Sequence, residues 1–335
     1  MTATKQRIEW LDIAKGIACL TVIVGHTISY DSPFRQLIFS FHMPLFFILS
    51  GYTFRIKPWR ELLHSSVRRL VIPYLCIYFI YHITMSLVTC DRISLSWAYQ
   101  NIMTFLFASG TTVLPFGFAA VGMPWFLVSL FFCRLIFNAV LRFGESHSDN
   151  RISTGLISTI LALSGYIVGG VLHFYLPFSL DISFVAVLFM WFGYIASTEG
   201  LLSVDQSPRR YWLAFLVVIS IWLVSARFSY LELAARRYDS VLLTLIAALS
   251  GTLMVCMFSS IVSKIKQSSI LGIFRVFLNF VGRNSMSIFC THSMDYVIPW
   301  ASLAAVRSLP FPNGITSCVR ILYNTVFAKL ILALK

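Results

Sequence analysis

The chain has 335 residues, of which 58% are hydrophobic and only 12% are charged. A soluble domain carries roughly 25% charged residues, so this composition excludes an ordinary soluble enzyme and is typical of a protein that crosses a membrane several times. The formal net charge is +13. Because the basic residues fall mostly in short segments between apolar runs, the positive-inside rule explains them, and nucleic acid is not expected as a partner.

A membrane-spanning helix needs about 20 mostly apolar residues. Such runs predict an all-α transmembrane bundle of ten helices. The first run begins with Asp12 and Lys15 and is expected to be a permanent first helix, not a cleaved signal peptide. No linker divides the chain, which predicts one membrane domain over residues 1–335. The ten predicted spans are residues 11–30, 37–54, 71–90, 123–142, 154–173, 180–197, 211–227, 240–262, 284–302 and 315–333.

Residues 98–118 form one more apolar run, but Gly110, Pro115 and Gly117 interrupt it. A re-entrant or interfacial element is therefore expected there, because an eleventh span would also invert the charge pattern of the later loops. With ten spans, the N-terminus and the loops near 55–70, 143–152, 199–210 and 263–283 share one side. These segments are rich in Lys and Arg, so both termini are predicted to be cytoplasmic.

The polar residues of the first span lie on one stripe of the helix. At 100° per residue, Lys15 and His26 are about 20° apart and Asp12 is within roughly 40° of His26. Such a stripe faces protein or a water-filled cavity, since charged groups in lipid are costly. An ion pair between Asp12 and Lys15 would explain those two residues without a function. It does not explain His26, for which a functional role is predicted.

His42 lies near the start of the second span, and Ser50 and Gly51 lie near its end. Adjacent antiparallel spans bring His42 and His26 to a similar depth and predict a shared polar pocket in the outer half of the membrane. A neutral imidazole can take a proton from a hydroxyl and return it, which acyl transfer to an alcohol requires. The alternative for His42 is a structural hydrogen bond to a backbone carbonyl.

Later segments add further candidates. Arg68 and Arg69 precede the third span on the cytoplasmic side, where they are either topology determinants or phosphate ligands. Trp125 opens the fourth span and is an interfacial anchor by position. His292 is a third buried histidine, roughly 13 Å inside its span. The seven cysteines show no metal-ligand spacing, so they are predicted to be buried apolar side chains and no metal is expected.

Together these segments resemble the acyltransferase 3 family of integral-membrane acyltransferases, especially its fucose 4-O-acetylase-like and polysaccharide O-acetyltransferase members. The resemblance rests on WLDIAKGIACLTVIVGH (10–26), FSFHMPLFFILSGYTF (39–54), RRLVIPYL (68–75), PWFLVSL (124–130) and VGRNSMSIFCTH (281–292). It implies a ten-helix fold. It also implies transfer of an acyl group, usually acetyl, from cytoplasmic acyl-CoA (acetyl-CoA) to a hydroxyl of a sugar or lipid-linked glycan.

The resemblance further implies roles for individual residues. His26 matches the family's essential first-helix histidine, Lys15 matches a position that is commonly Arg, and Arg68 and Arg69 match its arginines before the third helix. Lys15 lacks the planar fork of Arg. The family's Arg-x-x-Arg is absent, because Ser65 and Ser66 stand three residues before the two arginines.

The leading hypothesis is an O-acyltransferase in a bacterial inner membrane. His26 is the general base, His42 orients it or the acceptor, and Lys15, Arg68 and Arg69 hold the CoA phosphates, with four residues in support: Asp12, Ser50, Trp125 and His292. One alternative is a transporter of small organic acids or glycan units, although no repeat halves are visible. The other is a non-catalytic subunit of an envelope-assembly complex.

Overall fold

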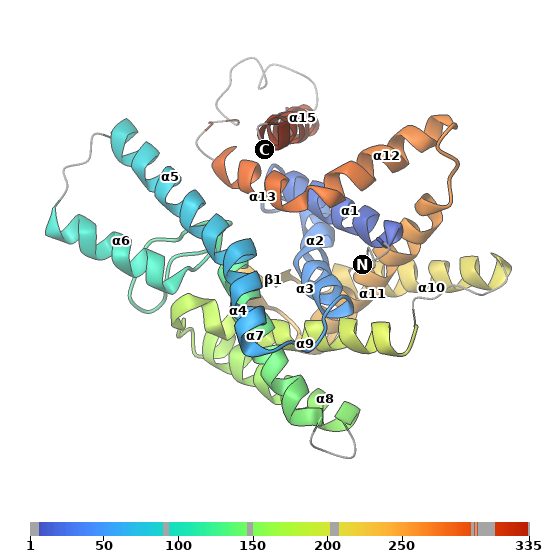
Figure 1. The fold of residues 1–335 in the computed structure, drawn as a ribbon, viewed down its shortest axis with the longest axis horizontal. Coiled ribbons are helices and arrows are strands. Elements are labelled where there is room, and N and C mark those ends of the chain that lie inside the picture. Colours follow the sequence, from blue (N-terminus) through green and yellow to red (C-terminus); the bar gives the residue numbers. More distant parts are fainter. Residues whose placement is uncertain are drawn as a thin grey trace. The chain divides into compact units, whose positions relative to one another are not determined.

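The computed structural model describes residues 7–89, 94–145, 150–201, 208–295, 298, 300 and 312–333. Within these ranges the chain is almost entirely helical (Figure 1). A single pair of two-residue strands is antiparallel, with Leu231 opposite Tyr238. The elements in chain order are α1 (Glu9–Gly25), α2 (Pro33–Phe39), α3 (His42–Tyr52), α4 (Trp59–Ser66), η1 (Val67–Val71), α5 (Ile72–Thr89), α6 (Leu95–Phe107), α7 (Trp125–Glu145), α8 (Asn150–Gly165), η2 (Tyr166–Val171), η3 (Pro177–Ser179), α9 (Leu180–Thr198), α10 (Pro208–Arg227), β1 (Leu231–Glu232), η4 (Leu233–Ala235), β2 (Arg237–Tyr238), α11 (Val241–Ser263), α12 (Ile270–Arg283), α13 (Ser285–Met294) and α15 (Pro312–Ala333).

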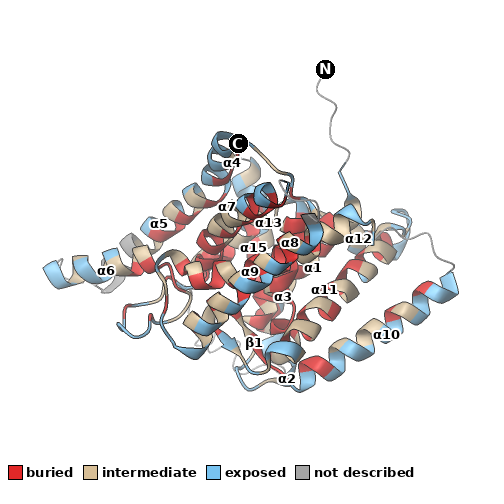
Figure 2. Cartoon of the chain, turned by 90° about the horizontal axis from the view of Figure 1, so that it is seen from below, coloured by how far each residue is buried: buried red, intermediate tan, exposed pale blue. Residues whose placement is uncertain are grey.

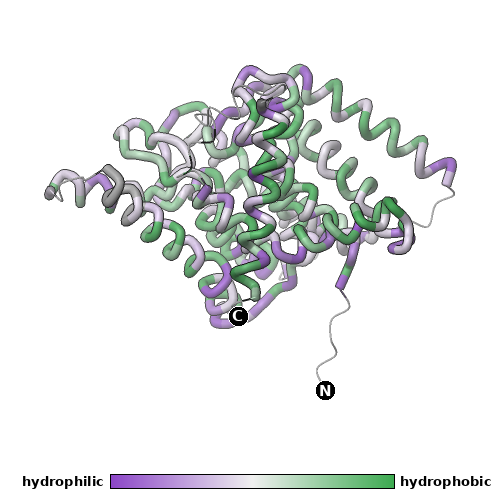
Figure 3. Tube along the Cα trace, turned by 90° about the horizontal axis from the view of Figure 1, so that it is seen from above, coloured by the Kyte–Doolittle hydropathy of each residue, from purple (hydrophilic) through white to green (hydrophobic). Residues whose placement is uncertain are grey.

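Six helices of the described ranges are long and apolar enough to cross a membrane: Trp125–Glu145, Arg151–Val171, Pro177–Thr198, Pro208–Arg227, Val241–Ser263 and Asn313–Ala333. They coincide with six of the predicted spans. Hydrophobic residues, green in Figure 3, are frequent along the helices. Helix α10 is mostly pale blue and tan in Figure 2, so many of its large apolar side chains are exposed. Exposed apolar helices of this length are suited to lipid.

The other four predicted spans have a different form. Helix α1 has 17 residues, α3 has 11, and α13 has 10 before the described range ends. Helix α5 has 18 residues, close to the length of a span. The total of ten spans and the side of the membrane on which each terminus lies stay predictions.

The predicted second span, 37–54, is not one continuous helix. Its start belongs to α2, and α3 begins only at His42 after a turn at Ser40 and Phe41. Pro33 opens α2, where its missing N–H costs nothing. The Ser40 hydroxyl stabilises the turn, because it donates to the Leu37 carbonyl and accepts from the Trp222 indole. The break places His42 at a helix start.

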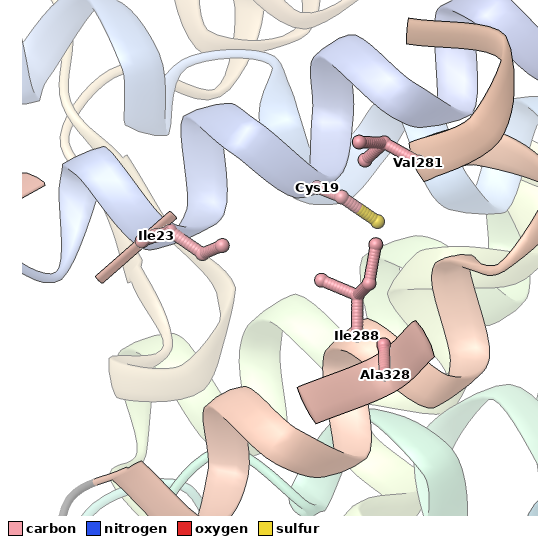
Figure 4. Packing of buried hydrophobic residues seen from close by; sticks show 5 residues of the cluster. All are labelled: Cys19, Ile23, Val281, Ile288 and Ala328. Carbon is pink, nitrogen blue, oxygen red and sulfur yellow. The ribbon is translucent and has the colours of Figure 1, made fainter. Parts of the chain in front are cut away.

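The helices divide into two compact units, and α3 runs from the first into the second. The first unit contains residues 1–46, 202–230 and 240–335. In it, α1 packs against α11, α12, α13 and α15. A cluster of buried side chains joins four of these helices (Figure 4): Cys19, Ile23, Val281, Ile288 and Ala328. Helices α1 and α12 cross closely at Gly16 and Gly282, where an added Cβ would overlap the facing backbone.

The second unit contains residues 47–201 and 231–239, with α7, α8 and α9 packed together. After α6 ends at Phe107, the predicted re-entrant region continues as an irregular segment. Arg236 holds this segment: its buried guanidinium donates to Ser109 at 2.6 Å and to both carboxylate oxygens of Asp181, at 2.7 and 3.3 Å. It also lies 3.9 Å from the Tyr175 ring centroid. This buried pair connects the segment to the start of α9.

Candidate active site

His26 lies at the end of the first helix. Helix α1 ends at Gly25, and His26 caps it with a backbone N–H bond to Val22. A Cβ on Gly25 would stand 2.9 Å from the Phe39 ring, so the glycine lets α2 approach this helix end. As a result the His26 ring lies edge-on to Phe39, with the ring centroids 5.9 Å apart.

His42 contacts the same aromatic ring. Its centroid is 4.6 Å from that of Phe39, and the residue is buried. The Nδ1–H of His42 donates to the Ile38 carbonyl at 3.0 Å, which is the structural bond considered as an alternative from the sequence. That bond also fixes the tautomer, because in a neutral imidazole with a proton on Nδ1 the other nitrogen is an acceptor. His26 and His42 therefore share Phe39 as a neighbour.

His292 joins this group from α13. Its ring centroid lies 5.8 Å from that of His26, with the two planes at 49°. His292 is buried, and its Nδ1 donates to Oδ2 of Asp295 at 2.9 Å. Asp295 is also fully buried. An imidazole that donates to a buried carboxylate has a fixed ring orientation and tautomer, the arrangement that orients histidines in many active sites.

Asp295 is the centre of a buried network that ties α15 to the end of α1. Arg320 donates to its two oxygens at 2.6 and 3.2 Å, and Asn324 donates to Oδ2 at 2.8 Å. The same guanidinium donates to the His26 carbonyl at 3.1 Å and to the Thr27 hydroxyl at 3.0 Å. A carboxylate with these partners is compensated in charge and hydrogen bonding, as a buried ion must be.

Asp295, Arg320 and Asn324 were not predicted from the sequence. The signal was present, because an acidic residue lies inside the predicted span 284–302 and a basic one inside 315–333. Ionisable residues at such depth pair with one another and mark functional regions.

Arg35 adds a buried positive charge beside the histidines. Its guanidinium carbon lies 3.8 Å from the Phe39 centroid and 4.0 Å from that of Tyr30, and it donates to the Tyr230 hydroxyl. Arg35 is 2% exposed. The region around Phe39 thus combines imidazoles with a fixed cation, a setting that suits a developing negative charge.

The other end of α1 carries a cluster of charges. Buried Asp12 lies 3.8 Å from the Lys15 ammonium, 3.5 Å from Arg7 and 3.7 Å from Arg283. The predicted ion pair between Asp12 and Lys15 is therefore present, and two arginines share the carboxylate. Three cations around one carboxylate leave an excess positive charge, which an anionic ligand can use.

The remaining predicted site residues belong to the second unit. Arg68 and Arg69 are exposed on η1, a π-helical turn between α4 and α5, and such turns are frequent at functional sites. Ser50 accepts a hydrogen bond of 3.4 Å from Arg134. Trp125, predicted as an interfacial anchor, is buried at the start of α7. Among the described residues, no group of His, Cys, Asp and Glu side chains is arranged to hold a metal ion.

Apolar helices that can cross a membrane, together with an enclosed group of histidines and charges, define an integral membrane protein with a polar interior site. The family model described as "Acyltransferase domain" matches residues 8–325. The chain therefore belongs to the acyltransferase 3 family, and the family resemblance found in the sequence is confirmed.

One curated relative is the nodulation protein NolL of Mesorhizobium japonicum (strain LMG 29417 / CECT 9101 / MAFF 303099), 27% identical over 170 residues. The match covers 46% of this chain and 40% of that protein. The chain thus matches less than half of the length of this relative. No solved structure matches the chain.

Proposed function

We propose that the protein is an O-acyltransferase of a bacterial inner membrane. It moves an acyl group, typically acetyl, from cytoplasmic acyl-CoA to a hydroxyl of a cell-envelope or exported glycan. The observation that carries this proposal is the grouping of His26, His42 and His292 at the end of α1, with a buried carboxylate on His292, in a member of an acyltransferase family.

In the proposed reaction His26 is the general base. The acceptor hydroxyl loses its proton to His26 as its oxygen attacks the thioester carbonyl, and a tetrahedral oxyanion forms. The carbon–sulfur bond then breaks, the oxygen ester remains on the acceptor, and the CoA thiolate takes the proton back from His26. Arg35 is placed to stabilise negative charge in this region. His42, with its Nδ1–H held by Ile38, presents an acceptor nitrogen that orients the hydroxyl.

Asp295 and Arg320 are positioning residues in this proposal. Asp295 holds the tautomer and orientation of His292, whose ring lies against that of His26. Arg320 holds the His26 backbone through its carbonyl. Asp295 therefore acts on the base through His292, and Arg320 acts on it through the backbone of His26. A base that is fixed before the substrate arrives needs little reorganisation during the reaction.

The acyl-CoA donor is assigned to the basic residues that are predicted to lie on the cytoplasmic side. For its phosphates the first unit offers Lys15, which belongs to a cluster with excess positive charge, and the second unit offers the exposed Arg68 and Arg69. Lys15 and His26 are eleven residues apart, so the thioester must act about 16 Å from the phosphates along α1. The pantetheine arm reaches this distance, or an acyl-histidine relays the group.

The test is thiol release from acetyl-CoA by the purified full chain in nanodiscs, with a panel of nucleotide-linked and lipid-linked sugars. We expect acceptor-dependent thiol release and a fall of about 100-fold or more in His26→Ala. Ser29→Ala, an exposed site three residues away, is the matched control and should retain turnover. Near wild-type turnover in His26→Ala refutes the role of the base. Movement of a sugar across the membrane without thiol release would indicate a transporter instead.

A further inference from the structure

Helix α12 has apolar side chains that no described residue of its own unit covers. Gly272, Leu278, Val281 and Gly282 are buried, and α12 packs on α1. The first two turns of α12 carry large exposed apolar side chains. Their exposed fractions are 89% for Ile270, 63% for Leu271, 71% for Ile273, 46% for Phe274 and 52% for Val276.

Helix α12 on its own is too short to span a membrane. Its 14 residues extend about 21 Å, whereas the hydrocarbon core is about 30 Å thick. The side chain of Ser269 caps its first turn by accepting from the Gly272 N–H at 3.0 Å, so the helix has a defined start. The segment 263–283, predicted from the sequence as a cytoplasmic loop, therefore contains a short amphipathic helix.

The charge of this segment is of one sign. Residues 264–283 contain four basic residues and no acidic one. Lys264 and Lys266 are exposed directly before the helix, and Arg275 and Arg283 lie within it. A helix with exposed apolar residues and flanking bases is typical of an element that lies on an anionic membrane surface.

Its inner face is fastened to the start of α1. Arg275 donates to both oxygens of Glu9, at 2.8 and 2.6 Å, and Asn279 donates to the same carboxylate at 3.2 Å. The close crossing at Gly16 and Gly282 adds backbone contact. The Arg275 guanidinium and the Asn279 amide nitrogen are thus paired within the protein, whereas the exposed apolar side chains of α12 contact none of these polar groups.

We propose that α12 lies in the plane of the membrane at the cytoplasmic surface. Ile270, Ile273 and Phe274 insert among the acyl chains, and Lys264 and Lys266 contact the phosphates of anionic phospholipids. The occupant of this face is lipid, because the bases stand beside the apolar residues where the head groups would lie, and a protein partner would need acidic groups there. In this position α12 anchors the cytoplasmic end of α1 to the bilayer surface.

The test uses the full chain in nanodiscs of phosphatidylglycerol and phosphatidylethanolamine. A photo-crosslinking benzoylphenylalanine replaces Ile273, and a matched control carries it at Ser268, an exposed polar residue just before the helix. We expect phospholipid adducts at position 273, detected by mass spectrometry, several-fold more abundant than at 268. Crosslinks from 273 to a second copy, to another segment of the chain, or to no lipid at all refute the proposal.

A second measurement tests the charge. The double variant Lys264→Gln, Lys266→Gln should lower the ratio of phosphatidylglycerol to phosphatidylcholine adducts at position 273 by roughly fivefold or more in mixed nanodiscs. An unchanged ratio refutes the contact between these lysines and anionic head groups. Neither experiment depends on acyl transfer, so failure of the proposed reaction leaves both results interpretable.

Discussion

Replacement of Asp295 by Asn removes the negative charge at the centre of the buried network. The side chain of Asp295 is 0% exposed and that of Arg320 is 5% exposed, with 2.6 Å between the charged atoms. Asn has nearly the same size as Asp, so the variant leaves Arg320 as a buried charge without compensation. Removing one partner of such a pair costs about 3–5 kcal/mol. The cost comes from the desolvation of the remaining guanidinium and not from a lost contact alone.

The double variant Asp295→Asn, Arg320→Gln removes both charges. Since no buried ion remains, we expect it to recover most of the free energy of unfolding lost in the single variant. The measurement is thermal and denaturant unfolding of the purified protein in one detergent. The matched control is Asp239→Asn. Its pair with Arg237 is 39% and 60% exposed, so the change should cost no more than about 1 kcal/mol.

The same variants separate stability from positioning. The double variant should be stable yet lose turnover, because neither the tautomer of His292 nor the His26 carbonyl is held. We expect a lower kcat and little change in KM for the donor, since the proposed function assigns the donor phosphates to residues outside this network. If Asp295→Asn unfolds at the wild-type temperature, the buried ion pair between Asp295 and Arg320 is refuted. If the stable double variant retains wild-type kcat, the network is structural only.

Three further predictions concern α1 and its surroundings. Gly282→Ala should lower the unfolding temperature, because its Cβ would overlap a backbone carbonyl of α1. The control Gly314→Ala should not, because no atom lies within 4 Å of the added Cβ. Equal unfolding temperatures for the two variants refute the close crossing of α1 and α12. The hydrogen bond from Arg275 lowers the pKa of Glu9, so the stability from this pair is complete above the ordinary Glu pKa and is lost as pH falls through the lowered value. In Glu9→Gln the free energy of unfolding should fall less as the pH is lowered through the acidic range. An unchanged pH dependence contradicts the ion pair between Glu9 and Arg275. His42→Asn keeps an N–H donor but lacks the second ring nitrogen, so it should fold normally and lose roughly tenfold or more in turnover; wild-type turnover would restrict His42 to its structural bond.

The helical character and six of the spans followed from the sequence because both depend on local composition. A run of apolar residues is visible without knowing its neighbours. The break between α2 and α3 was not visible, since Ser40 and Phe41 interrupt no apolar pattern and the turn is held by Trp222, 182 residues from Ser40. Helix α12 was missed for a different reason: a search for runs of about 20 apolar residues overlooks a short amphipathic helix.

The partners of the buried charges could not be predicted for a related reason. Asp181 and Arg236 are 55 residues apart, and Asp295 and Arg320 are 25 apart. The sequence shows that Asp181, Asp295 and Arg320 are costly inside apolar runs, but their pairing is decided by which segments pack together. The pair of Asp12 and Lys15 was predictable because both lie on one helix face at a spacing of three residues. The depth and type of a residue can be predicted from its local sequence, whereas the network that holds His26 depends on tertiary packing.

The contacts of α1 indicate why a single helix carries both Lys15 and His26. Its first turn is fixed by the hydrogen bonds of Arg275 to Glu9, and its other end by the bond of Arg320 to the His26 carbonyl. Between them, the close crossing at Gly16 leaves no room for the helix to slide past α12. A helix held at both ends and in the middle keeps the separation of about 16 Å between its basic residue and its imidazole constant. In the proposed reaction the enzyme therefore does not carry its base to the donor. The donor's thioester arm, or an acyl group detached from it, must cover that distance, which is set by the length of α1 between Lys15 and His26.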